Sequence, residues 1–308
     1  MVRHLLTIED LSAKEIWGIF SRAAALKQAR RAGKRETSLA GKSLAMIFEK
    51  PSTRTRISFE VGMFELGGHA LHLASSNTQL GRGETYADTA RVLSRYVHGI
   101  MIRTFAQDAV ASLAEFSTVP VINGLTDRSH PCQVLTDIFT VIESRAGTQD
   151  VSRVKMCYVG DGNNMANSWI EAALVLGFPL AIATPPGFEP DAPLSARAQK
   201  NANGASIEIH HDPVAAVRGA AVINTDTWVS MGQEGDDLAQ KKQLFAPFQV
   251  NAQLLRHAAP DAIVLHCLPA HRGEEITDEI MDGPQSRVFD EAENRLHVQK
   301  ALLEWCMK

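Results

Sequence analysis

Short apolar runs alternate along this chain with longer segments whose apolar residues recur at helical spacing. An apolar run of about four to eight residues bounded by turn residues is typical of a buried strand, and recurrence every three or four positions is typical of a helix with one buried face. The alternation stops once, in the polar stretch 144–152, and then begins again. The predicted strands are 44–48, 69–73, 99–102 and 119–122 before that stretch, and 154–159, 179–183, 205–210, 222–224 and 262–266 after it.

Strands that alternate with helices are typical of parallel sheets joined by right-handed crossovers. Because the alternation runs twice, we predict an α/β fold with two doubly wound domains, each containing a central, mostly parallel sheet. The first domain is expected over residues 1–143, completed by a C-terminal helix over 290–308, and the second over 151–289. A length of 308 residues, 45% of them hydrophobic, is sufficient for two cores.

Charge and composition exclude several classes of protein. The net charge is -4 and the basic residues are dispersed, so no nucleic-acid partner is expected. No apolar run approaches a membrane-spanning length and no signal peptide is recognisable, so we expect a cytoplasmic protein that does not bind a membrane. Four cysteines, at positions 132, 157, 267 and 306, fit a reducing compartment rather than a disulfide framework.

Neither a metal nor a cofactor is expected. His266, Cys267 and His271 are close in sequence, but no paired Cys-x-x-Cys or His-x3-His motif completes a zinc site. The turn 160–164 begins Gly-Asp-Gly, as in a dinucleotide site, yet Met165 stands where the third glycine is expected, and no acidic ribose ligand follows the next strand. These absences disfavour a nicotinamide-dependent oxidoreductase.

The turn after the first predicted strand has the features of a phosphate site. Pro51 breaks the strand, and Ser52 is a good capping residue for the helix that follows. The free N–H groups of a helix N-terminus, together with the hydroxyls and guanidinium groups of the segment 53–56, suit a phosphate. The alternative is an ordinary capped helix with solvated arginines.

Unusual polar residues gather at the carboxyl ends of the predicted strands, which is the edge where open α/β sheets bind ligands. We therefore expect the active site in the cleft between the two domains, closed by hinge motion. A polar loop over 75–84 is either a plain surface loop or one that reaches a partner. The strand-end residues are Ser52 to Thr55, Arg103, Asn123, Asn163, Asn164, Asp226 and Cys267.

The chemistry of these groups differs between the two halves. In the first half, Arg103, His130 and Gln133 are donors near the phosphate turn, and they suit a carbonyl oxygen that gains negative charge during attack. In the second half, amides, one carboxylate, a hydroxyl and a cysteine suit a zwitterionic amino acid. This combination indicates an acyl-type transfer from a phosphorylated compound to an amine, with positioning as the main catalytic device.

Four motifs carry a resemblance to a known family. The chain resembles the aspartate/ornithine carbamoyltransferases over essentially its whole length, and the last two motifs are similar to those of the ornithine-specific branch. The aspartate-specific branch places a lysine in the loop corresponding to 79–83, where the cation here is Arg82. The motifs are Ser52-Thr53-Arg54-Thr55-Arg56, His130-Pro131-Cys132-Gln133, Asp226-Thr227-Trp228-Val229-Ser230-Met231-Gly232 and His266-Cys267-Leu268-Pro269.

The resemblance implies transfer of the carbamoyl group of carbamoyl phosphate to the δ-amine of L-ornithine, giving L-citrulline and orthophosphate. It implies a homotrimer with shared sites, Gln79 reaching the neighbouring subunit, and a cis bond before Pro269. An arginine-biosynthetic role is favoured over a degradative one. The implied carbamoyl-phosphate ligands are Ser52, Thr53, Arg54, Thr55, Gln79, Arg103, His130, Gln133, Cys267, Leu268 and Arg295; the implied ornithine ligands are Asn164, Asp226, Ser230 and Met231; and the implied catalytic set is Arg103, His130, Cys267 and Asp226.

Several alternatives stay open from the sequence. The amine attacks directly in the favoured mechanism, whereas Cys267 as a nucleophile is the alternative. His266 is expected to point to the opposite face of its strand from Cys267, and so not to serve as the base for that thiol. Asn164 is favoured over Asn163 as the ornithine ligand. Two other functions remain as alternatives: transfer to a different amine, such as putrescine or an N-acylated ornithine, and a catalytically silent paralogue.

Overall fold

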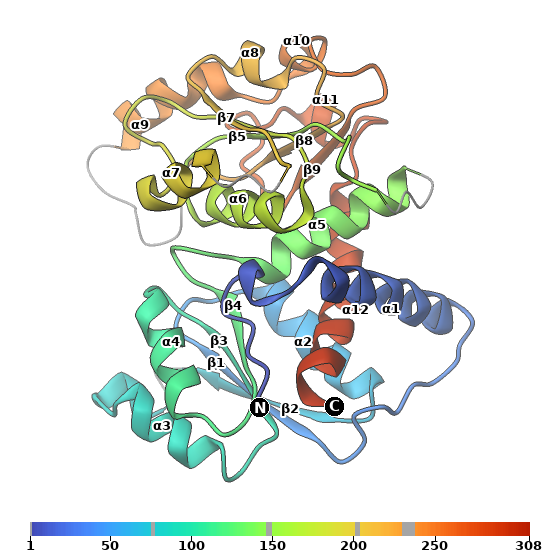
Figure 1. The fold of residues 1–308 in the computed structure, drawn as a ribbon, viewed down its shortest axis with the longest axis vertical. Coiled ribbons are helices and arrows are strands. Elements are labelled where there is room, and N and C mark those ends of the chain that lie inside the picture. The colour runs from blue at the N-terminus through green and yellow to red at the C-terminus, as the bar shows by residue number, and fades with distance from the viewer. Residues whose placement is uncertain (1, 75–77, 146–149, 201–203, 230–237) are drawn as a thin grey trace. The chain divides into compact units, whose positions relative to one another are not determined.

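A computed structural model describes residues 2–74, 78–145, 150–200, 204–229 and 238–308. The chain divides into two compact units, the first formed by Met1–Thr136 with Glu293–Lys308 and the second by Asp137–Ala292 (Figure 1). Both divisions fall inside helices, α5 (Pro131–Ser144) and α12 (Val288–Met307). Helix α5 therefore begins in the first unit and continues in the second.

The first unit is built on a four-stranded sheet in the order β2-β1-β3-β4, with every neighbouring pair parallel. Its helices cover both faces, and α3 and α4 pack on one of them (Figure 1). The strands are β1 (Ser43–Phe48), β2 (His69–Ala74), β3 (Gly99–Arg103) and β4 (Val121–Leu125); the other elements are η1 (Ile8–Asp10), α1 (Ala13–Arg31), α2 (Thr53–Glu65), η3 (Leu80–Arg82), α3 (Tyr86–Leu93) and α4 (Gln107–Phe116).

The second unit repeats the plan with a five-stranded parallel sheet in the order β7-β6-β5-β8-β9. Helices α8, α10 and α11 supply apolar residues to the core on one face of this sheet. The strands are β5 (Met156–Val159), β6 (Leu180–Ala183), β7 (Ile207–His210), β8 (Val222–Thr225) and β9 (Ile263–His266); the helices are α6 (Asn164–Leu176), α7 (Ala192–Lys200), α8 (Pro213–Val217), α9 (Leu238–Phe245), η4 (Ala246–Phe248), α10 (Ala252–Leu255) and α11 (Asp278–Met281).

The predicted α/β class with two parallel sheets is confirmed, and each predicted strand is present. The prediction for Asn123 was wrong, because it lies inside β4 and not beyond its end. The register with β3 shifts at this point, so the strand continues through a bulge at Gly124 to Leu125. The Asn123 amide donates to the Leu6 carbonyl over 2.8 Å and therefore fastens the N-terminal segment to the sheet.

Within the described part of the chain, no helix combines the length and apolarity needed to cross a membrane.

His297 links the stability of the first unit to pH. Its side chain is fully buried on α12, and burial, followed by the charge of Lys300, lowers its pKa from 6.5 to about 4. The folded protein therefore keeps this imidazole neutral at pH values where the unfolded chain binds a proton. Stability is present above about pH 6.5 and is lost as the pH falls from 6.5 towards 4.

We predict that His297→Gln reduces the fall in melting temperature between pH 7.5 and pH 5, because the variant has no imidazole to protonate in the unfolded chain. The measurement is a thermal melt of parent and variant at both pH values. His257→Gln, which changes an exposed histidine, is the matched control and should retain the parental fall. An equal fall in the His297 variant and the parent would contradict the assignment.

Candidate active site

The two sheets place the predicted site residues at their topological switch points. In the first sheet, β1 connects to β2 on one side while β3 connects to β4 on the other, so the switch lies between β1 and β3. In the second sheet, the switch lies between β5 and β8. Ligands of open α/β sheets bind beyond the carboxyl ends of the strands at such points. Ser52 to Thr55, Arg103, Asn163, Asn164 and Asp226 all follow or end these four strands.

In the first unit, the turn after β1 forms the predicted helix N-terminus. Ser52 is the N-cap of α2, and its hydroxyl accepts a hydrogen bond from the backbone N–H of Thr55 over 3.2 Å. This confirms the capping role, and the next residue, Thr53, is exposed. The first-turn N–H groups of the helix and its dipole favour an anion here.

A buried arginine from α12 joins this turn. Arg295 donates to the Thr55 hydroxyl over 3.0 Å and also to the side-chain carbonyl oxygen of Gln133, at the start of α5. Arg295, Thr55 and Gln133 are all nearly inaccessible to solvent. The structure therefore brings together three of the predicted ligands, although they are far apart in the sequence.

Two further cations or potential donors belong to the same unit. Arg103 ends β3, is buried, and its carbonyl accepts from the Glu49 N–H over 2.9 Å. His130 precedes α5, and burial, together with the charges of Arg295 and Arg103, lowers its pKa well below 6.5. At neutral pH, His130 is therefore a neutral imidazole that can donate one hydrogen bond without adding a charge.

Arg54 and Gln79 both carry side chains with room for a ligand. The Arg54 guanidinium is half-buried and makes no hydrogen bond or ion pair with another described residue. Gln79 is exposed at the start of η3, where its backbone carbonyl accepts from Arg82 and Glu84 while its side chain has no partner among the described residues. Neither side chain is needed to hold the local fold.

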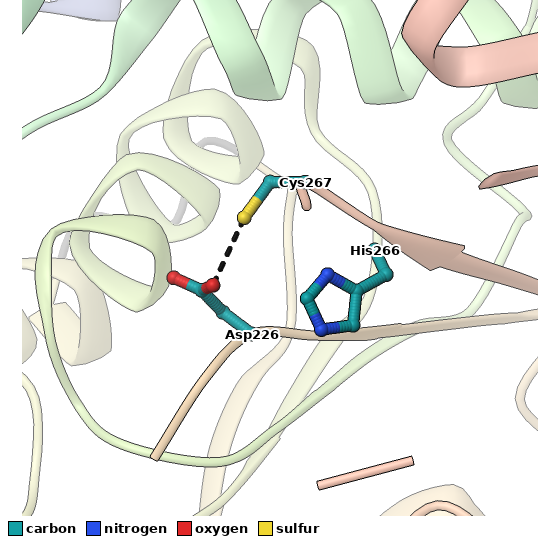
Figure 2. Close-up of side chains that lie close together, drawn as sticks. All are labelled: Asp226, His266 and Cys267. Atoms are coloured by element: carbon teal, nitrogen blue, oxygen red, sulfur yellow. Dashed lines mark hydrogen bonds between the residues drawn. The ribbon is translucent and has the colours of Figure 1, made fainter. Parts of the chain in front are cut away.

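In the second unit, three strand ends lie in register. Val159 of β5 is opposite Thr225 of β8, and Thr225 is opposite His266 of β9. The next residues, Asp226 and Cys267, are therefore neighbours, and the thiol of Cys267 donates to the Asp226 carboxylate over 3.0 Å (Figure 2). The same oxygen of Asp226 accepts from the Thr227 N–H over 2.7 Å, while its other oxygen has no partner among the described residues.

This contact makes Cys267 a poor nucleophile. Burial and then the negative charge of Asp226 raise the pKa of the thiol well above 9.0. Among the described residues, the ring of the neighbouring His266 is occupied by hydrogen bonds to Glu275 and to the Leu268 N–H, so it does not serve as a base for this thiol. Cys267 is therefore a protonated donor. The peptide bond between Leu268 and Pro269 is cis, which confirms that expectation.

The asparagines after β5 have different tasks. Asn163 is the N-cap of α6: its side-chain oxygen accepts from the Met165 N–H over 2.9 Å, and the Tyr158 hydroxyl lies 3.3 Å from it. Asn164 is buried in the first turn of the helix. The capping task of Asn163 agrees with the preference for Asn164 as a ligand. The other two predicted ornithine ligands, Ser230 and Met231, lie outside the described residues.

The glycines of this turn have a packing reason rather than a dinucleotide one. A Cβ atom on Gly162 would lie 2.3 Å from the Phe188 carbonyl oxygen, so only glycine fits beneath the 188–190 backbone. Asp161, the carboxylate in the turn, is paired with Lys241 over 2.7 Å. Gly162 and Asp161 of this turn therefore have structural roles.

His266 and Glu275 form a buried pair that the sequence analysis missed. The imidazole lies 3.0 Å from the Glu275 carboxylate, and both side chains are fully buried. Glu275 lies nine positions after His266 in a segment without a motif, so no sequence signal identifies the pair. Ligand atoms of Asp226, His266 and Cys267 lie within 4.8 Å of one another, but the hydrogen bonds of His266 and Cys267 to protein groups account for their placement.

Comparison with known proteins identifies the family. Residues 3–143 match the carbamoyl-P binding domain of aspartate/ornithine carbamoyltransferase, and residues 152–306 match the Asp/Orn binding domain of the same family. The chain therefore belongs to the aspartate/ornithine carbamoyltransferase family, as its motifs indicate.

The relatives it resembles are from the ornithine branch. The chain is 54% identical over 307 residues to the ornithine carbamoyltransferase of Syntrophotalea carbinolica, with 100% of both chains covered. It is also 54% identical to the anabolic ornithine carbamoyltransferase of Pyrococcus furiosus, covering 99% of this chain and 96% of the relative. The solved structure of ornithine carbamoyltransferase from Pyrococcus furiosus superposes with a TM-score of 0.94 at 53% identity, covering 99% of this chain and 97% of that one.

The state of the Cys267 thiol is open to direct measurement. We predict that iodoacetamide labels Cys267 at pH 8 on the order of tenfold or more slowly than a free thiol, because its raised pKa leaves little thiolate. Asp226→Asn removes a negative charge that raises this pKa, so labelling should become faster. The measurement is the time course of the modified peptide by mass spectrometry.

The matched control for this labelling experiment is Cys267→Ser, which should lose the signal without exposing the buried Cys132 and Cys157. Rapid labelling of the parent at neutral pH, or no acceleration in the Asp226 variant, would contradict the assignment.

Proposed function

We propose that this chain transfers the carbamoyl group of carbamoyl phosphate to the δ-amine of L-ornithine, releasing L-citrulline and orthophosphate. The observation that carries the proposal is the opposite character of the two half-sites. The first unit holds a capped helix N-terminus beside the buried Arg295 and Arg103, and the second holds the Asp226 carboxylate beside a protonated thiol. A doubly charged phosphate suits the first, and an amino acid with a free α-amino group suits the second.

For carbamoyl phosphate, we propose that Ser52, Thr53, Arg54 and Thr55 bind the phosphate. Arg103, His130 and Gln133 would contact its carbonyl and phosphate oxygens, and Arg295 would reach the same ligand. The burial of Arg103 and Arg295 supports this assignment, because in a site of low effective dielectric their charges act strongly on an anion. Arg54 supports it by carrying a guanidinium that no described residue neutralises.

For ornithine, we propose that Asp226 binds the α-amino group and Asn164 the carboxylate end, with Ser230 and Met231 completing the site. The Asp226 oxygen that has no described partner supports this role, since it can accept from an ammonium while the other oxygen holds Cys267. Cys267 and the Leu268 backbone would lie beside the attacking amine and the carbonyl. The division proposed from the sequence, 1–143 with 290–308 for carbamoyl phosphate and 151–289 for ornithine, follows these assignments.

The mechanism we propose is direct attack. The δ-amine attacks the carbonyl carbon in its neutral form, a C–N bond forms, and the oxygen that gains charge is stabilised by Arg103, His130 and Thr55. The C–O bond to phosphate then breaks, and the leaving phosphate accepts the amine proton. Asp226, Arg103, His130 and Cys267 would form the catalytic set. The neutral state of His130 and the protonated state of Cys267 support roles as hydrogen-bond donors.

The wider setting that we propose is arginine biosynthesis in the cytoplasm by a homotrimer. Two of the solved or curated relatives are named anabolic, which favours the biosynthetic direction. Gln79 would enter the carbamoyl-phosphate site of the neighbouring subunit. Its exposed side chain, on a turn held by backbone hydrogen bonds alone, supports such a reach.

The experiment that tests the function is a colorimetric assay of ureido product from carbamoyl phosphate, with ornithine, aspartate, putrescine and N-acetylornithine run in parallel. We expect turnover with ornithine alone, because only ornithine offers a free α-amino group for Asp226, a carboxylate for Asn164 and a second amine for the attack. Aspartate has no second amine, the α-amino group of N-acetylornithine is blocked, and putrescine has no carboxylate. Asp226→Asn should lower kcat/KM for ornithine on the order of 100-fold or more, as expected for loss of a close charge pair. Turnover with another amine would remove the ornithine assignments, and no turnover would indicate a silent paralogue.

The shared site can be tested by mixing two inactive variants. Gln79→Ala removes the side chain given to the neighbouring site, and Asp226→Asn removes the carboxylate of the subunit's own site. In a trimer that contains both variants, some sites therefore combine an intact Asp226 with an intact Gln79 from the neighbour. After co-refolding in equal amounts, about a quarter of the sites should be intact by random assembly around a closed ring. The measurement is citrulline formation by the mixture relative to each variant alone. No recovery, although mixed trimers are detected, would contradict the shared site.

A further inference from the structure

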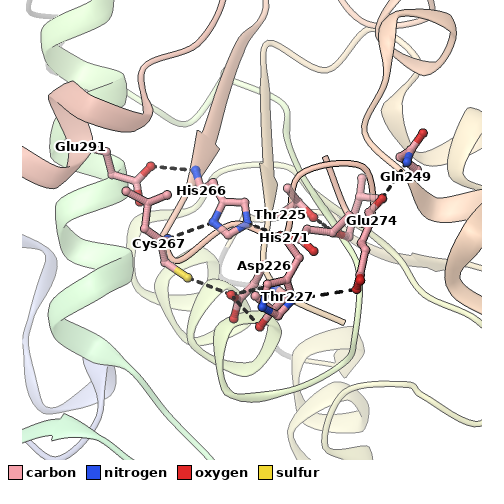
Figure 3. A network of polar contacts seen from close by, with 12 residues as sticks. Thr225, Asp226, Thr227, Gln249, His266, Cys267, His271, Glu274 and Glu291 are labelled. Atoms are coloured by element: carbon pink, nitrogen blue, oxygen red, sulfur yellow. Dashed lines mark hydrogen bonds and ion pairs between the residues drawn. The ribbon is translucent and has the colours of Figure 1, made fainter. Parts of the chain in front are cut away.

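The residues around the end of β9 form a network that the proposed ligands do not explain. Cys267 and Leu268 are proposed to contact the substrates. The residue before them, His266, has no proposed ligand, and its ring is fully buried. The backbone N–H of His266 donates to the Glu291 carboxylate over 2.9 Å (Figure 3). His266, the last residue of β9, is therefore fixed by hydrogen bonds of both its backbone and its side chain.

The hydrogen-bond partners of His266 define its tautomer. The backbone N–H of Leu268 points at Nδ1 over 2.9 Å, so Nδ1 must be the acceptor. The proton of the neutral ring is then on Nε2, which donates to Glu275 over 3.0 Å. The Glu275 carboxylate fixes this tautomer, because it can only accept. The ring is thus a rigid link between a buried carboxylate and the peptide that follows Cys267.

Glu275 holds the other end of the same segment. The oxygen that accepts from His266 also accepts from the backbone N–H of His271 over 2.6 Å. One carboxylate therefore ties the beginning of the turn at 267–271 to its end. Burying a carboxylate is costly unless donors compensate, and this one is fully buried.

Leu268 shows why the turn needs such support. Its φ is +59°, a left-handed conformation that costs a residue with a branched side chain on the order of 1 kcal/mol or more. The N–H of that same residue is the one that His266 accepts. Release of this hydrogen bond would let Leu268 relax, and the thiol and backbone of Cys267 would move with it.

We propose that His266, oriented by Glu275, is a positioning residue of the transferase: it accepts from the Leu268 N–H and so holds Cys267 and Leu268 in the geometry that the reaction needs. The proposal rests on the proposed function, since it takes the substrate contacts of Cys267 and Leu268 from it. Neither His266 nor Glu275 touches a substrate in this scheme.

Two substitutions of His266 separate the two hydrogen bonds. The side-chain oxygen of asparagine lies near the position of Nδ1, so His266→Asn keeps an acceptor for Leu268 but loses the bond to Glu275. The amide nitrogen of glutamine lies near the position of Nε2, so His266→Gln keeps a donor for Glu275 but loses the acceptor. Only His266→Gln removes the hydrogen bond from the Leu268 N–H, which is the contact that the proposed positioning role requires.

We expect kcat to fall on the order of 100-fold in His266→Gln, the effect of a small misplacement in a catalytic site, and much less in His266→Asn. Melting temperatures should run in the opposite order, because His266→Asn leaves the buried Glu275 carboxylate with one donor fewer. Activity and stability would then separate, which a purely structural role does not produce. Iodoacetamide labelling of Cys267 should accelerate in His266→Gln, reporting the released turn without any assay of activity.

Glu274→Gln is the matched control, because it removes the neighbouring carboxylate, which pairs with Lys242, and should retain parental kcat. A kcat that follows the melting temperature in both His266 variants, or a His266→Gln variant within about twofold of the parent, would overturn the positioning role. Failure of the proposed function is distinguishable, because the parent protein itself would then show no turnover with ornithine.

Discussion

Every strand in both sheets runs parallel to its neighbours, and this constraint determines where the chemistry of the chain can lie. Parallel strands deliver all of their carboxyl ends to one edge of a sheet, and the crossover helices return the chain to the other edge. Where the chain order reverses, two strand ends lie side by side without a crossover helix above them. The residues after β1 and at the end of β3 occupy one such position, and those after β5 and β8 occupy the other.

The two edges have opposite electrostatic character. In the first unit, Arg103 and Arg295 are buried, and burial of the His130 imidazole, together with these two charges, lowers its pKa well below 6.5. In the second unit, burial and then the negative charge of the Asp226 carboxylate raise the pKa of the Cys267 thiol well above 9.0. In each unit, burial and a neighbouring charge therefore act in the same direction on the protonation of the group beside them, and that charge is the one proposed to bind the substrate.

Much of this arrangement could be predicted from the sequence, because it depends on local patterns. The apolar runs gave the strands, and the Pro-Ser step gave the capped helix at the phosphate turn. Asn123 was misplaced, because a bulge depends on pairing with β3 and leaves no mark in the strand itself. The contact between Cys267 and Asp226 needed the register of β8 and β9, although both residues were identified singly. The burial of Glu275 could not be predicted from the sequence, because a buried carboxylate is recognisable only from the donors that surround it.

The protonation states also constrain where the proton of the attacking amine goes. Cys267 already carries a proton, and the nearby Asp226 carboxylate keeps it there, so the thiol cannot accept another. Burial lowers the pKa of His130 well below 6.5, and the charges of Arg295 and Arg103 lower it further, so that imidazole is a weak base. The departing phosphate gains a negative charge on the oxygen that leaves the carbonyl carbon, so it is a better acceptor than either side chain. In the proposed reaction, the protein therefore contributes placement and charge, while the substrate carries the proton away.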